Sequence, residues 1–121
     1  MRKTERGFTL IEVQVVVVII GILSAIGIPN YWSYKRDAAD AQAKSDLRGM
    51  ATALEGYFAD ANTYVGATLP LLQSSYGFRQ TATVTHTIVS LDGEHYVVSA
   101  SSVGGTGTLT FDSAVGRVTG S

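Results

Sequence analysis

The chain has 121 residues and contains no cysteine, only two prolines and only two histidines. Without cysteine it forms neither a disulfide scaffold nor a thiolate metal site, and it has no cysteine nucleophile. The histidines, His86 and His95, are too few to complete a usual zinc site. We interpret both as surface residues of strands, and we expect no metal and no cofactor.

Charge is also scarce, because Asp, Glu, Lys and Arg make up 16% of the chain. Nine basic residues face ten acidic ones, for a net charge of −1. This balance excludes a strongly basic nucleic-acid binder by bulk electrostatics but leaves nucleic-acid binding itself open. The length fits one domain.

A long hydrophobic run is present directly after a basic leader. Residues 1–7 read MRKTERG, and the 21 residues of Phe8–Ile28 carry one charge, Glu12. As a helix this run would be about 30 Å long, the thickness of a bilayer's hydrocarbon core. A strand of that length would be too long for a small domain. The run therefore predicts a membrane-spanning helix whose basic end stays in the cytoplasm.

The remaining sequence predicts an α+β fold. Apolar residues at three- and four-residue steps extend the helix to about residue 61, interrupted at most by Pro29, and Asn62 ends it. The charged residues in the first half of this extension, Asp46 among them, are expected to face solvent. Residues 63–82 read as a loop with at most one short turn at 69–73. Leu47, Leu54 and Phe58 are expected to cover the apolar face of a sheet.

Strand patterns follow at residues 83–90, 95–101 and 108–113, with a short fourth strand ending at residue 119. Asp92-Gly93 is expected to form a tight two-residue hairpin turn, because Asp-Gly suits a positive φ. The fold class is thus a long N-terminal helix, its first half transmembrane, packed on a small antiparallel sheet of three to four strands.

The hexapeptide Gly7-Phe8-Thr9-Leu10-Ile11-Glu12 lies between the basic leader and the apolar helix. With Gly21, Pro29 and Asn30-Tyr31, it resembles the N-terminus of type IV prepilins and their pseudopilin relatives over residues 1–34. The resemblance implies that a membrane-embedded prepilin peptidase cuts between Gly7 and Phe8 and methylates the new amine of Phe8. It divides the chain into a leader (1–7), a transmembrane and filament-core helix (8–28) and a periplasmic or extracellular pilin-like domain (29–121).

Glu12 is the lone carboxylate in the apolar run, and such a group is costly in hydrocarbon unless it is paired. The resemblance implies that Glu12 neutralises the N-terminal amine of a neighbouring subunit during filament assembly. A Glu that extends to the lipid headgroups is the alternative. Gln14 departs from the apolar residue usual in the family. It is either a packing contact in a filament or a polar residue near the membrane surface.

The resemblance implies a structural subunit of a type IV pilus, serving motility, adhesion or DNA uptake, and not an enzyme. Its implied partners are further copies of itself, the prepilin peptidase, the pilus assembly machinery and, before assembly, inner-membrane lipid. It would be a single-pass inner-membrane protein first and part of an extracellular filament afterwards.

Two alternatives remain. One is a pseudopilin of a type II secretion or competence system. The more remote one is a secreted domain whose signal peptide is cut after Gly27, although Glu12 and Gln14 interrupt the apolar core that such a peptide needs. Gly104–Gly107 is glycine-rich but precedes a predicted strand, not a helix, so it does not indicate a dinucleotide site.

Overall fold

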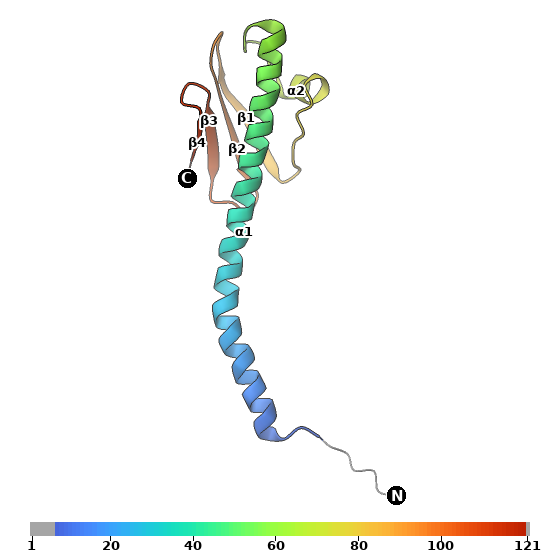
Figure 1. Cartoon of the computed structure of the whole chain (residues 1–121), viewed down its shortest axis with the longest axis vertical. Helices are drawn as coiled ribbons and strands as arrows, with labels where there is room; N and C mark the ends of the chain where they lie inside the picture. The colour runs from blue at the N-terminus through green and yellow to red at the C-terminus, as the bar shows by residue number, and fades with distance from the viewer. Residues whose placement is uncertain (1–6, 121) are drawn as a thin grey trace, which may run out of the picture. The chain divides into compact units, whose positions relative to one another are not determined.

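A computed structural model of the chain describes residues 7–120, so residues 1–6 of the predicted leader lie outside the described residues. The elements follow in the order α1 (Leu10–Ala61), α2 (Leu69–Ser75), β1 (Val84–Leu91), β2 (Tyr96–Ser102), β3 (Thr108–Asp112) and β4 (Arg117–Gly120). The chain forms two compact units, one ending at Tyr34 and one beginning at Lys35, and α1 contributes to both (Figure 1).

The first unit consists of the beginning of α1 and the residues before it. Every large apolar side chain from Phe8 to Ile28 is exposed. This part of α1 is long and apolar enough to span a membrane. The helix continues through Pro29 without a break.

The second unit is a four-stranded antiparallel sheet combined with the end of α1 and with α2. The strand order is β1-β2-β3-β4, so each strand pairs with the next one in sequence (Figure 1). Leu47, Met50 and Leu54 of α1 are completely buried and share one core with Val98 of β2. The predicted α+β fold and the predicted helix face are therefore confirmed.

The helix end is confirmed at Asn62, which follows α1 with a φ of 55°. Asparagine tolerates this left-handed conformation better than most residues and often ends helices. The short turn expected at residues 69–73 is a seven-residue helix, α2, whose N-terminus is capped by the Thr68 hydroxyl.

The predicted two-residue turn at Asp92-Gly93 is wrong. Four residues, 92–95, separate β1 from β2, and Gly93 has no positive φ. Instead, the Asp92 carboxylate accepts the backbone N–H of Glu94 at 2.8 Å and also that of His95. The aspartate side chain thus shapes the turn, as in an Asx-turn.

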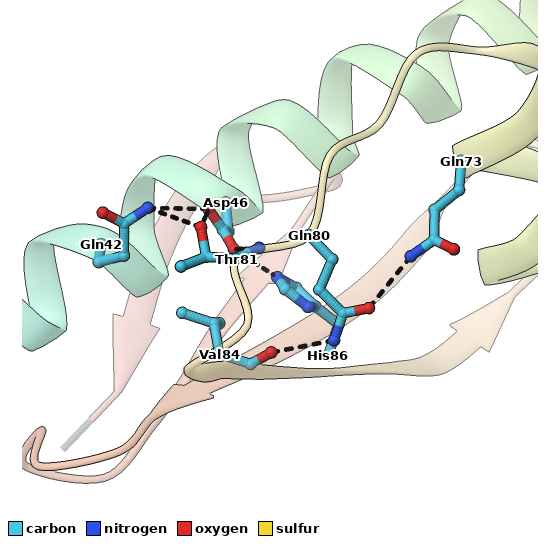
Figure 2. Close-up of polar contacts among 7 residues, drawn as sticks. All are labelled: Gln42, Asp46, Gln73, Gln80, Thr81, Val84 and His86. Atoms are coloured by element: carbon cyan, nitrogen blue, oxygen red, sulfur yellow. Dashed lines mark hydrogen bonds and ion pairs between the residues drawn. The ribbon is translucent and has the colours of Figure 1, made fainter.

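Asp46 and His86 are both buried, so the predictions that they face solvent are wrong. Figure 2 shows Asp46 at the centre of a polar cluster between α1 and the segment before β1. Its carboxylate accepts the Thr81 backbone N–H and hydroxyl, each at 2.9 Å, and the Gln42 amide at 3.1 Å. Burial of Asp46 is tolerated because these donors replace water.

His86 extends from β1 toward the same carboxylate, with its Nε2 3.3 Å from Asp46 Oδ2. The two groups are close but poorly aligned, since neither imidazole nitrogen makes a hydrogen bond among the described residues. Burial lowers the pKa of His86 below its ordinary value, and the charge of Asp46 opposes this shift. A protonated His86 would also bury an unpaired Nδ1–H. The imidazole is therefore neutral at pH 7.

We predict that a chain shortened to residues 35–121 folds on its own. The whole hydrophobic core lies within this range, beginning with Ala43. Circular dichroism and the dispersion of amide resonances check this expectation. A well-expressed but unfolded product would contradict the division into two units.

The free energy of unfolding of this shortened chain should decrease as the pH falls below about 6.5. The pKa of His86 is lower in the folded state, so the unfolded state binds more protons in that range. The contribution of His86 to stability is therefore complete above its pKa in the unfolded chain, and it is lost as the pH falls toward its pKa in the folded chain. Urea unfolding at pH 7.5 and pH 5 measures the decline, and His86→Phe should flatten it.

His95→Gln is the matched control, because His95 is exposed and should leave the decline unchanged. Asp40 and Asp92 act in a separate range, since their pKa values are lowered from 3.8 and they lose their stabilising effect only below it. An equal pH response in His86→Phe and the parent would refute the role of His86.

Candidate functional site

The candidate site is the segment from Gly7 to Glu12, where α1 begins. The Thr9 hydroxyl accepts the backbone N–H of Glu12 at 3.2 Å, and Glu12 Oε2 accepts the backbone N–H of Thr9 at 3.3 Å. This reciprocal arrangement is a capping box, which satisfies two of the donors left free at a helix N-terminus.

The sequence interpretation missed this role of Thr9. The signal was there to be found, because Thr-x-x-Glu directly before an apolar run is the sequence signature of a capping box. A carboxylate in the first turn also interacts favourably with the helix dipole, by about 0.3–1 kcal/mol. Glu12 therefore has a structural function within its own chain.

Phe8 and Glu12 lie on the same face of this segment. Together with Ile11, Val15 and Val16 they line a shallow hollow of about 420 Å³. Phe8 itself is 87% exposed. The geometry thus places one carboxylate beside an open apolar surface.

Gly7 lies before the helix and is exposed. A Cβ added to it would meet nothing within 4 Å. Space within residues 7–120 therefore does not require glycine at this position.

Within residues 7–120, no group of three or more His, Asp or Glu side chains could hold a metal ion. Between Gly7 and Tyr34, Glu12 is the sole charged residue.

The glycine-rich loop at Gly104–Gly107 is held against α1. Asp40 accepts the backbone N–H of Thr106 at 2.9 Å and its hydroxyl at 2.7 Å. Both hydrogen bonds lower the pKa of Asp40, and the bond from the Thr106 hydroxyl has the larger effect. A Cβ on Gly105 would lie 2.5 Å from Asp40 Oδ1, so a side chain there would displace the carboxylate that holds Thr106. Gly104 has a φ of 85°, which favours glycine. Both glycines therefore have a structural explanation.

Comparison with known proteins identifies relatives of both parts of the chain. Residues 2–28 match the family described as the prokaryotic N-terminal methylation motif. The chain is 36% identical to the type IV wide pilus major component PilA4 of Thermus thermophilus, over 86% of this chain and 79% of that protein.

Other relatives match over about half of the chain. Identity is 44% with the type IV major pilin protein PilA of Myxococcus xanthus, over 49% of this chain, and 41% with type II secretion system core protein G of Aeromonas hydrophila, over 52%. The matches span 27% and 44% of those two proteins' lengths. The similarity to PilA4, in contrast, extends through most of both chains. On that similarity, the chain belongs to the type IV pilin-like family.

Proposed function

We propose that the protein is a structural subunit of a type IV pilus and not an enzyme. The observation that carries this proposal is the wholly exposed apolar face of residues 8–28, interrupted by the lone carboxylate of Glu12. A surface of that kind needs lipid or other protein chains around it. The second unit has its own core, which begins at Ala43, and we predict that it folds without this helix segment.

A pseudopilin of a type II secretion system is the second candidate, supported by the identity with core protein G. That match covers 52% of this chain, whereas the match to the pilus component PilA4 covers 86%. The longer match favours the pilus.

Before assembly, residues 8–28 anchor the subunit in the inner membrane and residues 29–121 lie outside the cytoplasm. Assembly by the pilus machinery then exchanges lipid contacts for contacts with other subunits. A repeated head-to-tail interface that does not close into a ring generates a filament. Loss of the leader at Gly7 by a prepilin peptidase precedes this step.

Glu12 joins the subunits by charge pairing with the methylated Phe8 amine of a neighbour. One carboxylate oxygen, Oε2, accepts the Thr9 N–H, while Oε1 accepts no hydrogen bond from residues 7–120. The capping box therefore leaves an oxygen for an incoming ammonium group. Both charges are costly alone in an apolar bundle, and docking satisfies both.

The mature chain should begin at methylated Phe8 and should be found in surface filaments. Intact mass of filaments sheared from cells tests both statements. Gly7→Val should retain the leader, because a branched side chain hinders the approach of the peptidase to the scissile bond, while Gly7→Ala should be processed in part. A chain starting at Met1 or Ile28 contradicts the processing. Absence of the chain from surface filaments favours the pseudopilin.

Glu12→Ala should insert into the membrane at least as well as the parent but should form few or no filaments. It leaves the partner's amine without a counter-charge, and losing one member of a buried ion pair costs about 3–5 kcal/mol at each contact. Electron microscopy counts the filaments, and immunoblotting of the membrane fraction measures insertion.

Two further variants separate charge from helix capping. Glu12→Gln retains a capping-box side chain but not the charge, so it should fail nearly as badly as alanine. Thr9→Ala removes a cap worth about 1 kcal/mol but keeps the charge, so it should still assemble. Normal filaments from Glu12→Gln would refute charge pairing, and a failure of Thr9→Ala as severe as that of Glu12→Ala would assign the effect to the cap.

A further inference from the structure

A groove of about 370 Å³ lies in the second unit, where α1 meets the β3–β4 edge of the sheet. It is lined by Lys44, Arg48, Phe111, Gly116, Arg117 and Val118. Lys44 and Arg48 are one helical turn apart, so they share a face of α1. Phe111 and Val118 are opposite each other in the β3–β4 ladder and supply apolar surface to the groove.

The three cations of this groove make no ion pair with a carboxylate of the described residues. Asp112 is opposite Arg117 in the ladder, but its Oδ1 accepts the backbone N–H of Ala114. Asp40 is near enough to Lys44 for a long-range attraction, yet its oxygens bind Thr106. Three cations beside the carboxylates of Asp40 and Asp112 leave an excess of one positive charge at the groove, on a chain whose net charge is −1.

The β1–β2 hairpin has the complementary properties. Asp92 and Glu94 are exposed at its turn. The ladder between β1 and β2 is irregular between Ile88 and Ser90, and Val89 at this point is 59% exposed. Bulges of this kind redirect a side chain away from its ordinary place in the sheet. The hairpin thus offers two carboxylates and one apolar side chain.

The sheet places the hairpin and the groove at opposite edges, because β1 and β4 are the outer strands. In an antiparallel meander the β1–β2 and β3–β4 turns lie at the same end. Copies placed side by side therefore bring the hairpin of one copy level with the groove of the next. Two different surfaces in contact form a heterologous interface, which repeats without closing on itself unless the rotation forms a ring.

We propose that this groove receives the Asp92–Glu94 turn of a second copy of the chain. This inference rests on the proposed function, since a filament supplies the neighbouring copy. The three cations of the groove match the two carboxylates of the turn. Phe111 and Val118 add apolar surface that a protein segment would cover and a soluble polyanion would not, so the second copy fits more of the observed surface.

Engineered cysteines test this contact directly, because the native chain has none. In the full-length chain, Glu94→Cys with Arg117→Cys should give a ladder of disulfide-linked oligomers from oxidised filaments on a non-reducing gel. Within one copy, β2 and β3 separate the two positions by about 10 Å, beyond the reach of about 7 Å for a disulfide. Each single variant should give no ladder. Glu94→Cys with Arg79→Cys, an exposed position outside the groove, should give none either.

Charge reversal in the Glu94→Cys, Arg117→Cys background tests the electrostatics. Arg48→Glu should reduce the cross-linked fraction several-fold, whereas Arg36→Glu, on the same helix but outside the groove, should not. If the double-cysteine variant forms filaments whose chains run only as monomers on the non-reducing gel, the proposed contact is overturned. A ladder equally strong in the Arg79 control would overturn it as well.

The outcomes also separate this contact from the proposed function. If the parent forms no filaments at all, the proposed function fails. If filaments form, give no ladder and bind duplex DNA in a manner that Arg48→Glu abolishes, then the groove serves a polyanion and the contact between copies is refuted.

Discussion

The apolar side chains of residues 8–28 must be kept from water, and the described chain provides no surface that covers them. Fourteen large apolar residues in this range are exposed. Each gains about 1.5–3 kcal/mol when it is buried, so their combined burial is worth on the order of 20–40 kcal/mol. That exceeds the stability of a typical whole domain. The location of the protein therefore depends first on what covers this helix face. On the proposed function, that is lipid before assembly and other subunits after it.

The second unit meets the same physical requirement within itself. Its part of α1 buries one stripe of apolar residues against the sheet, and the polar groups that this burial encloses find partners nearby. Asp46 is the clearest case, since donors from Thr81 and Gln42 replace its water. On the proposed function, the predicted independence of this unit lets the apolar segment of α1 change its surroundings without disturbing the core that Leu47 and Leu54 form.

The sequence predicted those parts of the fold that depend on local signals. The three- and four-residue spacing of Leu47, Met50 and Leu54 indicated the buried helix face, and Asn62 marked its end. Burial of Asp46 and His86 could not be found in this way, because it depends on a loop 35 residues away in sequence that brings Thr81 to the carboxylate. A polar residue in a pattern reads as exposed until its distant partners are known.

The same distinction applies to the sites. Gly7, Phe8 and Glu12 lie in one short motif and could be predicted from it, and their processing and assembly roles stay predictions. Thr9 was missed although its signal is local. The cationic groove could not have been predicted, because it combines Lys44 and Arg48 with residues more than sixty positions later. Such a surface exists only once the β3–β4 hairpin lies beside α1.

The capping box adds a step to the proposed role of Glu12. Cleavage after Gly7 would create a positive amine next to the N-terminus of α1, where the helix dipole is also positive. These like charges repel, and a carboxylate in the first turn offsets both. Since Oε2 is already held by the Thr9 N–H, the carboxylate is oriented before any partner arrives. On the proposed function, assembly then costs little ordering of this side chain.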